Sequence, residues 1–306
     1  MSTHKTIIDQ ELVLSFLKSN FSEFISNLEM IIGGEGSQAY SFEIGAEKYI
    51  IRINKHYSLG FKKDEYAYVN YSKKNIPIPK IYKIGKIDEQ YNFCISQRAE
   101  GKVLNSLSLD NLDKLNQELF RILDLIHAVD ISNTEGYGKW NELGFGENKS
   151  WKERILSADE YAKTTEEKPG LFDTTFLEKD FWDLVYGRMV ELLKYCPEER
   201  YLVHGDYGFG NILFDGEKIT AIIDWESSMY GDFLFDVAWL GIWSQKVDYI
   251  KLYLEQSLKK GIEIKNFNER ILCYKLYIGL RTLSFFAYSD QEDKYHKLKE
   301  TISKFL

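Results

Sequence analysis

The sequence predicts an α+β protein with two lobes, a small antiparallel-sheet lobe followed by a larger helical lobe, with the active site in the cleft between them. The chain has 306 residues, enough for two domains of about 100–200 residues each. Residues 39–99 contain short alternating apolar runs, which are typical of strands. After Gly101 apolar residues recur every three or four positions, as in helices. We place the boundary at a hinge, so that the lobes span residues 1–97 and 98–306.

The first lobe begins with a predicted β-hairpin over residues 39–53. Apolar side chains alternate on both sides of a turn that starts at Gly45, namely Tyr40, Phe42 and Ile44, then Tyr49, Ile51 and Ile53. The period of two places Arg52 on the opposite face from its apolar neighbours. A helix follows over residues 62–71, and residues 81–99 supply two more strands.

The second lobe is predicted to be mainly helical. A long amphipathic helix covers residues 109–126, where leucines and isoleucines form one stripe. Further helices are expected at 151–163, 176–195, 246–260 and 267–287. Between them, Asp215-Gly216 separates two apolar runs and is a strong signal for a hairpin turn.

The charge distribution limits the possible partners. The formal net charge is −8, and residues 204–236 contain seven acidic side chains but only one lysine. Nucleic-acid binding requires the opposite field, so we expect no nucleic-acid partner. A metal ion, a cationic small molecule, or both would suit this segment.

Other sequence features indicate a cytoplasmic protein without a membrane partner. The N-terminal residues have no apolar core typical of a signal peptide, and no apolar stretch is long enough to span a bilayer. Cys94, Cys196 and Cys273 are far apart in the sequence, which argues against a zinc site or a disulfide framework. We expect a cytoplasmic monomer.

The segment that carries chemistry is LVHGDYGFGNILFDGEKITAIIDWE, residues 202–226. Its hairpin returns Asp224 to the end where Asn211 lies, and Asp206 stands shortly upstream on a glycine-rich loop. Mg²⁺ prefers hard oxygen ligands and binds phosphates together with one or two protein groups. Protein kinases likewise place a catalytic Asp before a metal-binding Asn, with a second metal-binding Asp after a hairpin. The pattern therefore predicts phosphoryl transfer, with Asp206 as the base and with Asn211 and Asp224 as Mg²⁺ ligands.

Several blocks resemble the aminoglycoside phosphotransferases, whose fold is that of protein kinases. They are GGEGSQAYSFEIG (33–45), YIIRIN (49–54), NIPIPKIYKIG (75–85), CISQRAEG (94–101), the catalytic block (202–232) and FDVAW (235–239). The N-terminal blocks are most similar to the hygromycin B branch of the family. The resemblance implies transfer of the γ-phosphate of ATP or GTP to a hydroxyl of an aminoglycoside-type antibiotic, which confers resistance.

The resemblance also implies roles for residues of the first lobe. A loop over the nucleotide phosphates would include Gly34, Glu35, Gly36 and Ser37. Arg52 occupies the strand position where kinases have a phosphate-binding lysine, and Glu65 on the next helix would be its ion-pair partner. The hinge that reads the edge of the base would be formed by Ser96, Gln97, Arg98 and Ala99.

In the second lobe the implied roles concern the catalytic loop and the acceptor. His204 would anchor the loop by hydrogen bonding, and Asp236 would hold it from behind. Glu226, Asp232 and Trp243 are candidates for contact with a cationic acceptor.

The motif alone does not choose the acceptor, because one fold and one catalytic set serve many substrates. A kinase for another hydroxylated small molecule, such as an amino alcohol, an amino sugar or a macrolide, has the same residues. A non-catalytic nucleotide-binding protein is the alternative from another class, and it would be expected to lack part of the catalytic set.

Overall fold

The computed structural model describes residues 6–32, 36–55, 59–107, 112–160, 162–163, 170–244 and 247–306. The chain forms two compact units. Unit 1 comprises residues 1–122 and 209–226, and unit 2 comprises residues 123–208 and 227–306. The predicted catalytic block is therefore divided between the units, because Asp206 belongs to unit 2 whereas Asn211 and Asp224 belong to unit 1.

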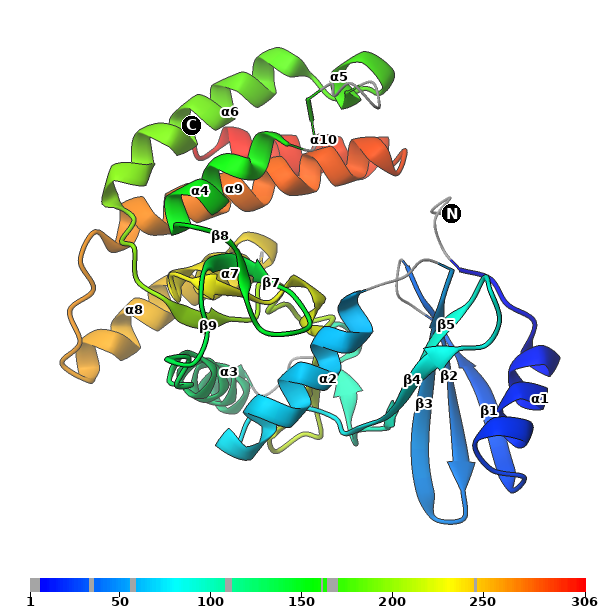
Figure 1. Ribbon diagram of the computed structural model, residues 1–306. Helices are drawn as coiled ribbons and strands as arrows, with labels where there is room; N and C mark the ends of the chain where they lie inside the picture. The colour runs from blue at the N-terminus through cyan, green and yellow to red at the C-terminus, as the bar shows by residue number, and fades with distance from the viewer. Residues whose placement is uncertain are drawn as a thin grey trace. The chain divides into compact units, whose positions relative to one another are not determined.

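Unit 1 is built on a five-stranded antiparallel sheet with strand order β1-β2-β3-β5-β4 (Figure 1). Its strands are β1 (Ile25–Ile31), β2 (Gln38–Ile44), β3 (Glu47–Asn54), β4 (Ile81–Lys86) and β5 (Asn92–Gln97). The predicted hairpin is confirmed, because β2 pairs with β3 from Gln38↔Ile53 to Ile44↔Glu47. The two strands expected within 81–99 are confirmed as β4 and β5.

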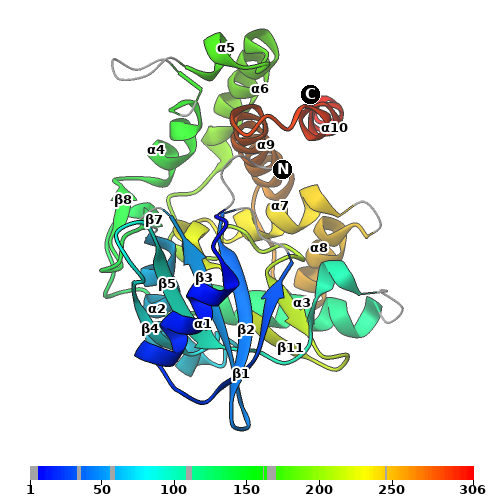
Figure 2. The same cartoon turned by 90° about the vertical axis from the view of Figure 1, so that its right-hand side faces the viewer.

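One face of this sheet is covered by helix α1 (Gln10–Asn20), which lies against the strands in Figure 2. The shared core consists of Ile8, Val13, Leu17, Tyr40, Phe42, Ile51, Ile53, Phe93 and Ile95. Asp9 caps the helix, since its carboxylate accepts hydrogen bonds from the backbone N–H groups of Glu11 and Leu12. Because Ile51 and Ile53 face α1, Arg52 projects from the opposite face, as the alternation predicted.

Helix α2 (Leu59–Tyr71) lies on the side towards which Arg52 projects, since its Asp64 pairs with Arg52. It confirms the helix expected at 62–71. Unit 1 also contains a small antiparallel sheet with the order β11-β10-β6. Its strands are β6 (Lys102–Val103), β10 (Ile212–Phe214) and β11 (Ile219–Ile222). The expected hairpin is thus confirmed, and its turn is held by the Asp215 carboxylate, which accepts from the N–H groups of Glu217 and Lys218.

Unit 2 is mainly helical, and the long helix α9 runs through it and packs against α6, α7 and α10. The helices are α4 (Trp151–Leu156), α5 (Leu171–Thr174), α6 (Lys179–Leu192), α7 (Leu234–Trp243), α8 (Tyr249–Lys259), α9 (Phe267–Tyr288) and α10 (Glu292–Ser303). Helix α3 (Leu112–His127) leads into this unit. The predicted helices correspond to α3, α4, α6, α8 and α9, although α4 ends at Leu156 and not at residue 163. In this unit α5, α7 and α10 were not predicted.

A four-stranded sheet with the order β8-β7-β12-β9 completes unit 2. Its strands are β7 (Tyr137–Trp140), β8 (Gly146–Asn148), β9 (Tyr201–Val203) and β12 (Met229–Gly231). Strand β9 leads directly into the loop that carries Asp206. No helix in the described part of the chain is long and apolar enough to cross a bilayer.

Candidate active site

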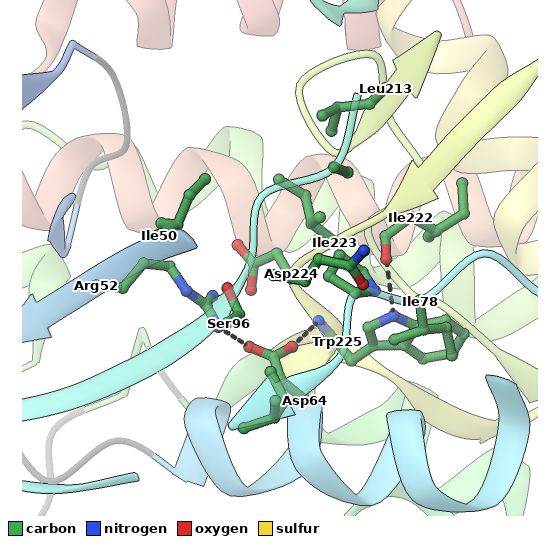
Figure 3. Close-up of a pocket in the computed structure, with 14 residues that line it drawn as sticks. Ile50, Arg52, Asp64, Ile78, Ser96, Leu213, Ile222, Ile223, Asp224 and Trp225 are labelled. Atoms are coloured by element: carbon green, nitrogen blue, oxygen red, sulfur yellow. Dashed lines mark hydrogen bonds and ion pairs between the residues drawn. The ribbon is translucent and has the colours of Figure 1, made fainter. Parts of the chain in front are cut away.

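A pocket in unit 1 lies beside Arg52, Asp64 and Asp224 (Figure 3). It encloses about 520 Å³ of empty space, part of which is open to solvent. Its apolar lining consists of Ile50, Ile78, Pro79, Ile81, Leu213, Ile222, Ile223 and Trp225, and its other lining residues include Ser96, Gln97 and Ala99. An apolar chamber with a cation and a carboxylate in its wall can hold a flat organic ring next to anionic groups.

Arg52 is fixed in the pocket wall by its neighbours. Its guanidinium donates to the Asp64 carboxylate and, at 3.7 Å, to the Cys94 Sγ atom. It also lies over the Phe61 ring, 5.1 Å from the centroid. Burial alone would lower the pKa of Arg52, but the Asp64 carboxylate and other nearby acidic groups together outweigh this effect and raise the pKa above its ordinary value. Arg52 therefore presents a permanent positive charge.

The predicted pairing of Arg52 with Glu65 is wrong. The partner is Asp64, whose side chain is 7% exposed, whereas Glu65 is exposed. Adjacent helical residues point about 100° apart, so only one of two neighbouring acids can face the strand. The missed signal is the stripe formed by Phe61, Asp64, Ala67 and Tyr71, which share one side of α2 at spacings of three and four residues.

Helix α2 also contacts the chain around Asp224. The second oxygen of Asp64 accepts a hydrogen bond from the Trp225 backbone N–H at 2.8 Å. The ammonium group of Lys63 donates to the Glu226 carbonyl oxygen, also at 2.8 Å. Asp224 itself has a φ of 64°, in the left-handed region. Sequence reasoning missed both Lys63 and Asp64 because charged residues on a helix are usually solvated.

The two predicted metal ligands lie at the same end of the hairpin. The Ile223 N–H donates to the Asn211 carbonyl oxygen at 3.0 Å, which places Asn211 beside the residue that precedes Asp224. Asp224 lines the pocket. Across the described ranges no three His, Cys, Asp or Glu side chains form a metal-binding group. Asp224 and Asn211 offer one carboxylate and one amide oxygen, and such donors together with phosphate oxygens suit Mg²⁺.

Most of the predicted hinge lies at the pocket. Ser96, Gln97 and Ala99 line the pocket, whereas the Arg98 side chain is exposed. The backbone N–H groups of Gln97 and Arg98 donate to the carbonyls of Lys80 (2.8 Å) and Lys48 (3.0 Å).

Only part of the predicted phosphate loop can be placed. Gly36 is exposed and Ser37 is half-buried, immediately before β2. Gly34 and Glu35 lie outside the described residues.

In unit 2 the loop that carries Asp206 is held by Asp236. The two oxygens of this fully buried carboxylate accept from the backbone N–H groups of His204 (2.9 Å) and Gly205 (2.8 Å). His127 contacts the same carboxylate at 3.3 Å. His204 is also fully buried, and its Nδ1 atom accepts from the Asp206 N–H at 3.3 Å. Asp236 and His204 therefore contact the loop where the sequence predicted.

Gly205 and Gly208 allow the loop to pack tightly within unit 2. Gly205 has a φ of 77°, and a Cβ there would lie 2.2 Å from the Ser227 carbonyl oxygen. A Cβ on Gly208 would lie 3.2 Å from Trp239 Nε1 and 3.8 Å from Asp206 Oδ1. The carboxylate of Asp206 and the indole of Trp239 are therefore both close to Gly208.

The three predicted acceptor contacts differ in their surroundings. Trp243 is 41% exposed at the end of α7, with its ring 6.1 Å from that of Trp239. Glu226 is exposed in unit 1.

Asp232 is the exception, and the prediction that it meets the acceptor is wrong. Its carboxylate is fully buried and accepts two hydrogen bonds from the Arg270 guanidinium, one at 2.8 Å and one at 2.5 Å. The Tyr274 hydroxyl and the Leu234 N–H donate to the same carboxylate. The sequence around Asp232 did not indicate that Arg270, which lies 38 residues later, would pair with it.

The chain is similar to known phosphotransferases in sequence and in structure. The phosphotransferase enzyme family (APH) matches residues 28–258. Over 275 residues the chain is 32% identical to the hygromycin-B 4-O-kinase of Escherichia coli. This alignment covers 89% of this chain and 77% of that protein. The crystal structure of aminoglycoside phosphotransferase APH(4)-Ia matches with a TM-score of 0.83 at 28% identity, over 97% of this chain and 98% of that one.

Two further structures extend the comparison. A thermostable mutant of APH(4)-Ia in a ternary complex with AMP-PNP and hygromycin B has a TM-score of 0.82 at 28% identity, over 95% of this chain and 96% of that one. The GDP complex of aminoglycoside 2'-phosphotransferase-IIIa shares the fold, with a TM-score of 0.69. Its identity to this chain is 17%, over 97% of this chain and 98% of that one. These matches confirm the predicted family resemblance and the kinase-like α+β fold.

Proposed function

This chain belongs to the phosphotransferase enzyme family, and from that premise we propose that it transfers the γ-phosphate of a nucleoside triphosphate to a hydroxyl of an aminoglycoside-type antibiotic of the hygromycin B kind. The observation that carries the proposal is the unit 1 pocket, where an apolar chamber meets the fixed cation Arg52 and the carboxylate of Asp224. A nucleotide has the matching parts, a flat base and an anionic phosphate chain.

The base of the nucleotide would occupy the apolar part of this pocket. Ile50 on β3 and Ile222 on β11 line the pocket and would contribute apolar surface for a purine ring. The hinge would supply backbone groups for its edge. Ala99 lines the pocket. Its backbone N–H would be the donor to a ring nitrogen, which both ATP and GTP offer.

The phosphates would meet Arg52 and a metal ion. A guanidinium presents several N–H donors in a plane, which suits phosphate oxygens. Asn211 and Asp224 would hold Mg²⁺, which when bound neutralises charge on the phosphate chain. Gly34, Glu35, Gly36 and Ser37 remain the proposed phosphate loop, and the proposed lobes remain residues 1–97 and 98–306.

Asp206 would act as the base that receives the proton of the attacking hydroxyl. Asp236 holds the backbone just before it, at His204 and Gly205, so this part of the loop is fixed before the substrate arrives. Such positioning is the main protein contribution to phosphoryl transfer, in which little covalent chemistry falls to the enzyme.

The acceptor would be a cationic molecule with sugar rings. Trp243, which is partly exposed, offers an apolar face on which a ring can stack, and Glu226 offers an exposed negative charge. The relative that is 32% identical is a hygromycin-B 4-O-kinase, and this favours hygromycin B over other acceptors. We expect the protein to act as a cytoplasmic monomer, without a nucleic-acid or membrane partner.

The test is mass spectrometry of hygromycin B after incubation with the protein, ATP and Mg²⁺. We expect a gain of one phosphate group, and no gain with Asp206→Ala, whose fold should be preserved. Full activity of Asp206→Ala would contradict the role of the base. A panel of amino alcohols, amino sugars and macrolides tests the alternative acceptors, since rapid ADP release with one of them and none with hygromycin B would reassign the substrate.

A further inference from the structure

Helix α2 makes three contacts with the two residues that follow Asp224. Asp64 accepts from the Trp225 N–H, and Lys63 donates to the Glu226 carbonyl oxygen. The ring of Tyr71, two turns further along the helix, lies 6.1 Å from that of Trp225. These contacts lie within unit 1 and involve the backbone immediately after Asp224.

The backbone at Asp224 needs such support. A φ of 64° is uncommon for a residue that is not glycine and persists where the surroundings fix it. The hydrogen bond from Trp225 N–H to Asp64 sets the orientation of the peptide group between residues 224 and 225. The bond from Lys63 then sets the peptide group that follows Glu226, so both ends of the Trp225–Glu226 segment are held by adjacent residues of one helix.

Lys63 is unusual for a lysine because only 2% of it is exposed. Burial of an ammonium group is costly unless hydrogen bonds and nearby charges compensate it. A hydrogen bond from a charged donor is stronger than one between neutral groups. This position therefore provides a strong and geometrically defined contact to the Glu226 carbonyl, which a solvated lysine could not provide.

We propose that Lys63 is a positioning residue for the metal site, which acts through the backbone after Asp224 and holds the Asp224 carboxylate where a divalent cation must bind. The proposal rests on the proposed function, because it takes Asp224 as a metal ligand. It assigns separate tasks to neighbouring residues of α2. Asp64 orients Arg52 toward phosphate, whereas Lys63 orients the metal ligand.

The experiment measures nucleotide and metal binding separately, with AMP-PNP and Mn²⁺ as probes. Binding of AMP-PNP without a divalent cation is followed by calorimetry, and Mn²⁺ binding to the protein–AMP-PNP complex by electron paramagnetic resonance. For Lys63→Met we expect the dissociation constant of Mn²⁺ to rise about tenfold, the size expected for loss of a charge-assisted hydrogen bond. Metal-free AMP-PNP binding should change by less than about twofold, since Arg52 and Asp64 are intact.

Two further variants separate this role from a general loss of stability. Lys63→Arg keeps a cationic donor and should recover most of the Mn²⁺ affinity. Lys73→Met removes an exposed lysine just after the same helix and should change neither constant. Thermal melting by circular dichroism is measured for each variant, and Lys63→Met is compared at temperatures where it is folded.

Three results would overturn the proposal. Unchanged Mn²⁺ affinity in Lys63→Met would show that Asp224 does not depend on Lys63. An equal loss of Mn²⁺ and metal-free AMP-PNP binding would show a purely structural role. A wild-type protein that binds no AMP-PNP at all would instead overturn the proposed function on which this proposal rests, whereas failure to phosphorylate hygromycin B would leave the binding test intact.

Discussion

Replacement of Asp232 by Asn tests whether this acid serves stability or substrate binding. The carboxylate is fully buried, and it neutralises Arg270, which is itself only 5% exposed. The pKa of Arg270 is lowered by its burial but raised overall by the hydrogen bonds and charge of Asp232. Asp232→Asn removes the negative charge and leaves the guanidinium buried without its counter-ion.

The expected cost is large because the change breaks one half of a buried pair. Removal of one partner of such a pair costs about 3–5 kcal/mol, mainly because the other charge stays desolvated. Native proteins are stable by only about 5–15 kcal/mol. At about 2–4 °C per kcal/mol, the melting temperature should fall by roughly 6–20 °C. The KM for hygromycin B should remain within about twofold, because the carboxylate contacts only protein groups.

The assay combines urea unfolding, followed by circular dichroism, with coupled ADP-release kinetics below the melting temperature. Glu226→Gln is the matched control, since it removes an exposed acid that we propose to meet the acceptor. It should raise the KM for hygromycin B and leave the unfolding midpoint unchanged. The reasoning would be refuted if Asp232→Asn kept the wild-type midpoint and raised this KM tenfold. In the double variant that carries Asp232→Asn and Arg270→Met, Arg270→Met should lower the free energy of unfolding by less than it does in the wild type.

Four other changes probe the rest of the site. Arg52→Met should weaken metal-free AMP-PNP binding about tenfold or more, measured by calorimetry, because a charge-assisted contact to phosphate is lost; unchanged binding would place the phosphates elsewhere. Burial raises the pKa of Cys94 from 9.0 to about 11, so the stability that this protonated thiol contributes is complete below pH 9 and is lost as the pH rises through 11. The wild type should therefore lose about 2–3 kcal/mol more than Cys94→Ala between these pH values in urea unfolding, and parallel curves would contradict this. Asp236→Asn should lower kcat at least about tenfold with little change in metal-free AMP-PNP affinity, because it loosens the loop of Asp206 and leaves the unit 1 pocket unchanged. Trp243→Ala should raise the KM for hygromycin B about fivefold or more and leave the KM for ATP unchanged, since one stacking face is worth about 1 kcal/mol or more.

The elements with a strong period were predictable from the sequence. The β2–β3 hairpin and the helices α3 and α9 follow from regular alternation or regular spacing of apolar residues. Strand β1, at the edge of the sheet, was missed because its sequence ISNLEMI has no period of two, and its half-buried positions recur every third residue. Helix α1 was missed because only Val13 and Leu17 are buried within it, too few to form a convincing stripe.

The part of the candidate site that one hairpin brings together was predictable from the sequence. A hairpin necessarily brings Asn211 and the region of Asp224 together, so this pair could be predicted from the turn signal alone. Contacts between distant elements could not be predicted in this way. The choice between Asp64 and Glu65 depends on the phase of α2, and the burial of Asp232 depends on Arg270, which lies far along the chain.

The acidic segment 204–236 shows why a local count of charges is a poor guide to the field that a substrate meets. Asp232 is neutralised by Arg270, and the Asp236 carboxylate is buried and shared between two backbone N–H groups and His127. Asp215 is engaged in its own turn, where the backbone N–H groups of Lys218 and Glu217 hold its pKa below the ordinary value. Three of the seven acidic side chains of this segment therefore stabilise its turns and loops. A cationic acceptor must be attracted by the acids that remain, and for this reason the exposed Glu226 is a better candidate for recognition than the buried Asp232.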